Sequence, residues 1–328
     1  MQTKSLGALT TSAVGLGCMA MSGAYGESDR TESIATLRAA LDAGITLVDT
    51  GDFYGMGHNE LLIAEALRGR PRESYQLSVK FGGLLGPDGS WVGFDARPAA
   101  VKSAAAYSLQ RLGTDYLDVY RPARLDPAVP IEDTVGAIGE LVDAGYVRHI
   151  GLSEVGSETI RRAAAIRPIS DLQIEYSLVS RGVERDILGT CRDLGIGVTA
   201  YGVLSRGLLG GHWARSAAAE RDSRSLYPRF SGENLDHNLS LVETLRGVAD
   251  QLGVSVAQAA IAWVASRGTD VVPLIGARTR TRLQEALGAV AVTLSDEQLT
   301  RIEAAVPDGE VAGDRYTAEH MAALDSER

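Results

Sequence analysis

Three residues of this chain are of the types that acid-base chemistry needs, and they lie close together in sequence: Asp49, Tyr54 and Lys80. Asp49 ends the apolar run ITLVDT, Lys80 ends the run QLSVK, and Tyr54 lies in the loop GDFYG just after Asp49. A phenol is a weak acid at neutral pH, and a neighbouring lysine cation favours the phenolate and so lowers the pKa of the phenol. Asp49 would keep Lys80 charged and in place. Together they predict that Tyr54 is a proton donor, if the fold brings the three side chains to one mouth.

Eight short apolar runs have the character of buried parallel strands, and amphipathic segments separate them. The runs cover residues 12–17, 45–50, 76–80, 116–120, 148–153, 172–177, 197–202 and 270–276. Glycines suited to helix C-termini follow the Ala- and Leu-rich segments, at Gly44, Gly69, Gly113, Gly145, Gly195 and Gly268. Strict alternation of eight strands and helices favours one α/β domain over residues 1–328, a single (β/α)8 or TIM barrel, over two doubly wound domains. Since a barrel forms its active site at the strand C-termini, Asp49 and Lys80 are expected at one mouth.

Three segments exceed the length that a minimal barrel needs: residues 81–95, residues 205–238 and the tail after Pro307. The first two follow strand ends, so extended active-site loops and a C-terminal tail are expected. The segment GLGCMA, residues 15–20, matches the GxGxxA pattern of a dinucleotide-binding fold. The helical pattern begins only near Asp29, however, which disfavours that fold. The glycines still indicate a close backbone approach at the end of the first strand.

At its motifs the sequence resembles the aldo-keto reductases. The resemblance covers nearly the whole chain and rests on VGLG, LVDTGDFYG, SVKFG, the Asp118 strand ending in RLDP, GLS at 151–153, QIEYS, AYGVLSRG and PLIGAR. It implies a barrel that binds NADPH in extended form and transfers hydride to a small-molecule aldehyde or ketone, with Tyr54 as general acid.

The resemblance also implies a set of cofactor-binding residues. Ser153 and Gln173 would contact the nicotinamide carboxamide, Tyr201 would stack on the ring, and Gly17, Cys18 and Met19 would approach its ribose. Leu204, Ser205 and Gly207 would line the pyrophosphate, and Gly276, Arg278, Arg282 and Glu285 would surround the adenosine 2′-phosphate. Guanidinium groups suit a doubly charged phosphate, which favours NADP over NAD.

Three positions depart from the family pattern. Glu154 follows Ser153 where most members carry an amide, and Ala286 stands where an asparagine usually meets the adenine. Ala123 occupies the place of the fourth catalytic residue, a histidine. Side chains alternate along YLDVYRPA, so Arg121 is expected to face the barrel interior below Ala123. Our hypothesis from the sequence is that Arg121 rises into the vacated space and partly replaces the histidine as an electrophile.

Composition excludes several classes of protein. The chain has 32 Lys+Arg against 42 Asp+Glu, a net charge of −10, and no basic block, which argues against nucleic acid or an anionic membrane as partner. No stretch reaches the roughly 18 apolar residues that span a bilayer. Two distant cysteines indicate no disulfide framework, and the spacing of the histidines indicates no metal site, so a cytoplasmic protein without a metal is expected. The oligomeric state is not readable.

Other interpretations stay open. Asp49 and Lys80 could form a purely structural ion pair, and Tyr201 could be an aromatic residue of the core. Arg278 and Arg282 could form a solvent-exposed helix face together with Glu285. Because Ala123 replaces the histidine, two other functions also fit: a low-turnover NADPH-binding regulatory subunit, and a reductase of an activated C=C bond.

Overall fold

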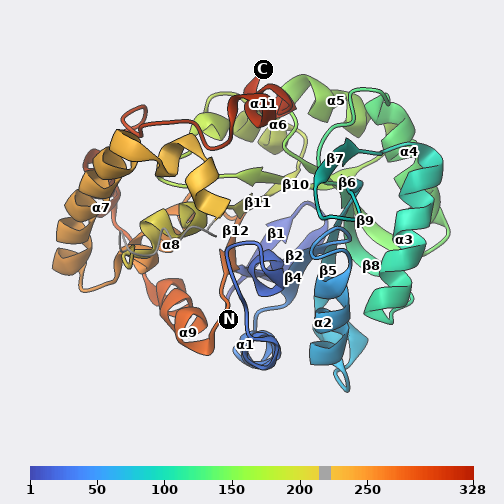
Figure 1. Ribbon diagram of the computed structural model, residues 1–328, viewed down its shortest axis with the longest axis horizontal. Coiled ribbons are helices and arrows are strands. Elements are labelled where there is room, and N and C mark those ends of the chain that lie inside the picture. Colours follow the sequence, from blue (N-terminus) through green and yellow to red (C-terminus); the bar gives the residue numbers. More distant parts are fainter. Residues whose placement is uncertain (214–222) are drawn as a thin grey trace.

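Eight parallel strands close into a barrel in the computed structural model, which describes residues 1–213 and 223–328 (Figure 1). Around the barrel the strands are β3 (Gly15–Gly17), β4 (Leu47–Gly51), β5 (Gln76–Phe81), β8 (Leu117–Pro122), β9 (Val147–Ser153), β10 (Ile169–Glu175), β11 (Gly197–Tyr201) and β12 (Val271–Gly276). Each one overlaps a predicted strand, and the predicted (β/α)8 barrel is confirmed. Every residue of β10 is buried, as expected for a parallel strand covered on both faces.

Helices cover the outside of the barrel between successive strands (Figure 1). They are α1 (Arg30–Asp42), α2 (His58–Leu67), α3 (Pro98–Leu112), α4 (Ile131–Asp143), α5 (Ser157–Ile166), α6 (Ile187–Asp193), α8 (Val256–Ala265) and α9 (Arg280–Gly288). Local signals explain their ends. Pro98 lies at the start of α3, where a missing N–H costs nothing, and Gly113 ends that helix with a left-handed φ of 64°.

A hairpin that the strand pattern did not predict lies at the start of the chain, formed by β1 (Thr3–Leu6) and β2 (Leu9–Ser12). Lys4 anchors it by donating hydrogen bonds from Nζ to the carbonyl oxygens of Ala265, Gly268 and Val271, at 2.6–2.9 Å. A side chain at Gly197 would collide with Leu6, because an added Cβ would lie 2.4 Å from the Leu6 Cα. The hairpin therefore packs on the end of the barrel where the strands begin, and the opposite mouth holds the predicted site.

The surplus segments contribute elements at that mouth and beside it. Residues 81–95 contain a hairpin of β6 (Gly83–Leu85) and β7 (Trp91–Phe94). The predicted loop 205–238 contains η4 (Ser205–Gly210), η6 (Ser223–Leu226), η7 (Pro228–Phe230) and the start of α7 (Gly232–Leu252), and its residues 214–222 lie outside the described part of the chain. α10 (Asp296–Ala305) packs on α7, and the tail then runs across the molecule to α11 (Ala318–Ala322) and η9 (Asp325–Glu327) (Figure 1).

Among the described residues, no single helix has the length and apolar character needed to cross a membrane. Within the described ranges, α7 and α8 taken together are long and apolar enough, but they meet at an angle of 84°.

Candidate active site

Asp49 and Lys80 form a buried ion pair inside the mouth of the barrel. Asp49 lies on β4 and Lys80 on the neighbouring strand β5, and their side chains are 2% and 7% exposed. One carboxylate oxygen, Oδ1, accepts a hydrogen bond from Lys80 Nζ. The other, Oδ2, accepts hydrogen bonds from Ser78 Oγ at 2.8 Å and from Gln173 Nε2 at 2.7 Å. The carboxylate of Asp49 is thus fully satisfied and holds the lysine in a fixed position.

Tyr54 completes the predicted trio from the loop after β4. The Lys80 ammonium lies 5.3 Å from the centroid of the Tyr54 ring. The ring of Phe53 packs edge-on against the Tyr54 ring, with 4.9 Å between the two centroids. Burial raises the pKa of Tyr54 well above its usual value, and the charge of Asp49 raises it further. The expected lowering of this pKa by Lys80 is therefore wrong for this structure, because burial and Asp49 dominate. The phenol keeps its proton at neutral pH, as a proton donor must.

Lys80 is also affected by its surroundings. Burial lowers the pKa of the ammonium below its usual value, while Asp49 opposes that effect. The positive charge at this position consequently depends on the carboxylate beside it.

Arg121 lies inside the barrel, as the alternation along its strand predicts, but it does not rise into the space above. Its side chain is fully buried, and its guanidinium pairs with Asp171 at 2.6 Å and donates a hydrogen bond to Ser78 Oγ at 2.7 Å. Asp171 precedes Gln173 by two residues on β10 and so lies one layer deeper in the barrel. The hypothesis that Arg121 replaces the missing histidine is corrected: its charge is satisfied by Asp171, and it contacts Asp49 only through Ser78.

Ala123 follows β8 at the position where the family pattern has a histidine. It is buried, and its backbone N–H bonds to the carbonyl of Phe81 at 2.8 Å. A methyl group neither donates nor accepts a proton, so no acid-base group stands at this place.

Two buried polar atoms beside the ion pair have no hydrogen-bond partner among the described residues: Ser153 Oγ and Gln173 Oε1. They lie next to each other in register on β9 and β10. Gln173 uses its Nε2 group to bind Asp49, which leaves its oxygen free to accept. Buried polar atoms are rarely left without a partner, and an amide group of a ligand would satisfy both an acceptor and a hydroxyl.

Glu154 does not act as a substitute for an amide at this place, because its carboxylate is fully engaged. Arg315 from the C-terminal tail binds it through both terminal nitrogens, at 2.8 and 2.5 Å. Arg315 holds the pKa of the buried Glu154 carboxyl below its usual value, although burial, the largest influence, acts in the opposite direction. The hydroxyl of Tyr201 donates to the same carboxylate at 2.7 Å, so the ring predicted to meet the nicotinamide is held by this network.

Arg315 and Tyr316 are site residues that the sequence did not reveal. Arg315 is 6% exposed, and the hydroxyl of Tyr316 lies 3.0 Å from that of Tyr201. The available signal was Glu154, since a carboxylate at the end of a buried strand requires a cation. The sequence does not indicate which arginine supplies it.

The residues predicted for the pyrophosphate lie in the turn after β11. Leu204 precedes η4, the buried Ser205 Oγ has no partner among the described residues, and Gly207 has a left-handed φ of 98°. A strained, polar turn of this kind offers backbone and hydroxyl groups to an anion.

The residues predicted for the 2′-phosphate lie after β12 and on α9. Arg278 donates to the carbonyl oxygens of Tyr25 and Glu27 at 3.1 and 3.0 Å, whereas Arg282 forms a half-exposed ion pair with Glu285 at 2.9 Å. Gly276, at the end of β12, faces open space. Arg282 and Glu285 thus form an exposed ion pair, as expected if these residues are only a solvated helix face. Arg278 has no carboxylate partner among the described residues.

Gly17, Cys18 and Met19 form the end of β3 and the start of η1 (Met19–Ser22). The Cys18 backbone N–H donates to the Asp49 carbonyl at 3.0 Å, which brings this turn against β4. Burial raises the pKa of the Cys18 thiol, so the residue is an inert part of the core.

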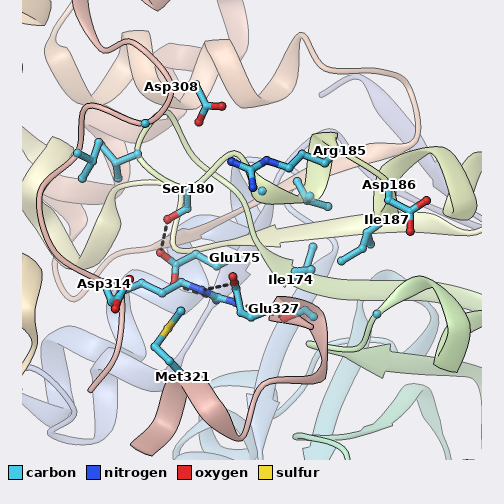
Figure 2. A pocket seen from close by; sticks show the side chains of 18 of the residues that line it. Ile174, Glu175, Ser180, Arg185, Asp186, Ile187, Asp308, Asp314, Met321 and Glu327 are labelled. Atoms are coloured by element: carbon cyan, nitrogen blue, oxygen red, sulfur yellow. Dashed lines mark hydrogen bonds and ion pairs between the residues drawn. The ribbon is translucent and has the colours of Figure 1, made fainter. Parts of the chain in front are cut away.

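A cavity of about 460 Å³ lies on the other side of the Glu154 network, between β10, the loop after it and the tail. Figure 2 shows Glu175, Ser180 and Glu327 around it, with Arg185, Asp186 and Asp308 further out. Asp49, Tyr54 and Lys80 do not line this cavity. It is therefore a separate feature from the mouth that holds these three residues.

The model of the aldo/keto reductase family matches residues 13–307, which include all eight barrel strands. The chain belongs to the aldo/keto reductase family. It is 42% identical over 306 residues to a probable aldo-keto reductase 1 of Glycine max, an alignment that covers 93% of this chain and 88% of that protein. This aldo/keto reductase is therefore an oxidoreductase by family.

Solved structures of other proteins have a similar fold. A glycerol dehydrogenase from Gluconobacter oxydans superimposes with a TM-score of 0.85 at 29% identity, covering 92% of this chain and 94% of that one. An aldo-keto reductase from Bacillus halodurans, in its holo form, gives a TM-score of 0.76 at 26% identity, with coverage of 93% and 96%.

Proposed function

We propose that this aldo/keto reductase uses NADPH to reduce the carbonyl group of small-molecule aldehydes or ketones. The observation that carries the proposal is the pair of unpartnered buried atoms, Ser153 Oγ and Gln173 Oε1, beside the Asp49–Lys80 ion pair. A nicotinamide carboxamide would satisfy both atoms. Gln173 also binds Asp49, so the cofactor position and the catalytic pair share one residue.

The reaction needs a hydride and a proton. Bound NADPH would supply the hydride to the carbonyl carbon. Tyr54 would donate its phenolic proton to the carbonyl oxygen, and Lys80, held by Asp49, would stabilise the phenolate that remains. The raised pKa of Tyr54 keeps the proton in place until a substrate oxygen that gains negative charge accepts it.

The preference for NADPH over NADH rests on the far end of the predicted cofactor site. Arg278 lacks a carboxylate partner among the described residues, and its guanidinium is available to a phosphate oxygen. Ser205 and Gly207 would hold the pyrophosphate between this end and the mouth.

Ala123 favours a second candidate, reduction of an activated C=C bond. Without an imidazole at this position, Tyr54 would be the group left among the described mouth residues to protonate the substrate, and the small Ala123 side chain would leave the substrate more room. A low-turnover NADPH-binding subunit is the third outcome that the same substitution allows.

The deciding experiment is NADPH oxidation by the purified protein against matched aldehydes, ketones and enones. Reduction of saturated aldehydes or ketones to alcohols supports the proposal. Products that keep the carbonyl but lose the C=C bond would assign the second function. Tight NADPH binding with no turnover on the whole panel would assign the regulatory role.

A small-molecule carbonyl compound is the expected partner of the protein, and we include a cytoplasmic location in the proposal. Cys18 and Cys191 are buried free thiols, which a reducing compartment preserves.

A further inference from the structure

Arg124 directly follows Ala123 at the mouth of the barrel and has a different role from Arg121. One terminal nitrogen, Nη1, donates to the carbonyl of Ala123 at 2.6 Å. The other, Nη2, donates to the hydroxyl of Tyr316 at 3.2 Å, from the C-terminal tail. Two neutral oxygens therefore hold the guanidinium in place, and the side chain remains partly exposed.

No carboxylate among the described residues forms an ion pair with Arg124, in contrast to the most deeply buried arginines, whereas Arg206 and Arg278, which are partly exposed like Arg124, also lack one. Arg121 pairs with Asp171, and Arg315 pairs with Glu154 and Glu327. Removing a guanidinium from bulk water without a counter-ion is costly, so such a group is commonly an anion-binding site.

The acid nearest in the network, Glu154, has no capacity left for Arg124. Its Oε1 accepts from the Glu175 backbone N–H, Tyr201 Oη and Arg315 Nη1, and its Oε2 accepts from Arg315 Nη2 and Ser326 Oγ. A carboxylate offers about four lone-pair sites, and these five donors occupy them. Glu154 therefore accepts no hydrogen bond from Arg124, although the two charges attract each other, and the donors of Arg124 that face no carboxylate are left for another anion.

Arg124 follows β8 at the same mouth as Lys80, because β8 pairs in register with β5 and the Ala123 N–H bonds to the carbonyl of Phe81. Its charge opposes the effects of burial and Asp49 on the pKa of Tyr54, and it adds to the effect of burial in lowering the pKa of Lys80. Its hydrogen-bond partner Tyr316 contacts Tyr201. The predicted phosphate contacts at Arg278 and Arg282 belong to α9 and the turn before it, on a different side of the barrel mouth from β8.

We propose that Arg124 is the anion subsite of the substrate pocket, which binds the carboxylate of an oxo acid while the carbonyl group of that substrate meets Tyr54. The inference rests on the proposed carbonyl reduction and gives it a substrate class. A planar guanidinium matches a carboxylate with two parallel hydrogen bonds. Ala123, which precedes Arg124, carries only a methyl group, and Tyr316 orients the guanidinium from the tail.

The test compares 4-oxobutanoate with its methyl ester, together with the longer ω-oxo acids and their esters, at saturating NADPH. The two members of each pair differ by one negative charge, so their kcat/KM ratio isolates that charge. We expect the wild type to favour at least one acid over its ester by about tenfold or more. In Arg124→Met this kcat/KM ratio should fall to near one. Arg124→Lys keeps the charge but loses the two parallel N–H donors of the guanidinium, so it should recover part of the preference for the acid.

Arg148→Met is the matched control. Arg148 is an exposed arginine at the start of β9, where it stacks over Tyr116 at 4.4 Å, so it lies at the opposite end of the barrel. This variant removes the same charge from the molecule and should keep the acid-to-ester ratio of the wild type. Circular dichroism and the melting temperature verify that each variant is folded.

A binding measurement separates this inference from the proposed function. 4-Oxobutanoate is titrated into wild type and Arg124→Met, with and without NADP⁺, which has no hydride to give. If esters and acids are reduced equally well, the subsite is overturned and carbonyl reduction stands. If no carbonyl compound is reduced, the proposed function fails, and the titration alone decides. Binding that is weakened about tenfold in Arg124→Met would then support the subsite, and equal or absent binding in both proteins would refute it.

Discussion

Tyr54 retains its proton because its environment is dry and contains the negative charge of Asp49. The lysine that was expected to favour the phenolate lies over the ring at 5.3 Å and is itself committed to Asp49. At the residue scale, this arrangement suits an acid that acts only when a substrate oxygen gains charge.

The first prediction tests that role. Tyr54→Phe removes only the phenolic oxygen. The Tyr54 hydroxyl is not one of the groups predicted to bind the cofactor, so NADPH affinity should change little. Turnover should fall by at least about a hundredfold, the lower range for a lost general acid. Steady-state kinetics and fluorescence titration measure the two quantities. Turnover retained in the variant would transfer the role to water or to another side chain.

A second prediction concerns Asp52, two residues before Tyr54. Burial, and next the charge of Glu60, raise the pKa of Asp52 to about 7, although Arg111 opposes them. In the unfolded chain an aspartate titrates near 3.9, so between about pH 4 and pH 7 the folded state binds more protons. The contribution of Asp52 to stability should therefore decline as the pH rises through this window.

Asp52→Asn should remove that decline, so its melting temperature should fall less between pH 5 and pH 8 than that of the wild type. Asp88→Asn is the control: Asp88 is exposed, and hydrogen bonds from Ser90 lower its pKa, so it titrates below the window. An identical pH dependence in wild type and Asp52→Asn would contradict the raised pKa.

At the scale of elements, strands β8 and β10 do not neighbour each other in the barrel, yet a buried charge pair joins them. Arg121 on β8 and Asp171 on β10 meet across the interior at 2.6 Å, and both side chains are completely buried. Asp171 also accepts hydrogen bonds from the backbone and hydroxyl of Thr199 on β11. Three strands therefore share one ion pair beneath the layer of Asp49 and Lys80.

Arg121→Leu should consequently act on stability first. Removing one partner leaves Asp171 buried without its counter-charge, which costs about 3–5 kcal/mol in the free energy of unfolding. The double variant Arg121→Leu/Asp171→Leu should recover much of that loss, because no buried charge remains. Urea unfolding measures both. A single variant as stable as the wild type would show that the pair is unimportant for the fold.

At the scale of the whole molecule, the predicted cofactor would extend from Ser153 and Gln173 in the mouth to Arg278 before α9. A ligand that binds only the folded state stabilises it, and by about 2.7 kcal/mol at one hundred times its Kd. NADPH and NADH differ only in the phosphate at the far end. The difference between their affinities therefore reports on the contacts at that end alone.

NADPH should bind at least about ten times more tightly than NADH, because charge-assisted hydrogen bonds to the extra phosphate are worth about 1.4 kcal/mol or more. Arg278→Met should reduce this preference, and Arg148→Met should leave it unchanged. Fluorescence titrations at one fixed ionic strength measure the six affinities, two nucleotides for each of three proteins. Equal affinities for the two nucleotides in the wild type would refute the preference.

The sequence by itself determined the barrel and the grouping of Asp49, Tyr54 and Lys80 at one mouth. Strand and helix periodicities are local, so eight apolar runs such as 76–80 could be recognised without knowing what they pack against. Once eight strands alternate with helices, closure into a barrel brings every strand end to one mouth, and Asp49 and Lys80 meet there as a consequence of topology.

The tertiary structure alone decided which charges are paired. Arg121 binds Asp171 and not a group above it, Glu154 is held by Arg315, and Arg124 is left without a carboxylate among the described residues. Glu154 and Arg315 are separated by 161 positions. No local pattern encodes such a contact, because every arginine of the chain carries the same charge and the same donors. Which of them reaches a buried carboxylate depends on how the strands, the loops and the tail pack, and only the folded chain specifies that.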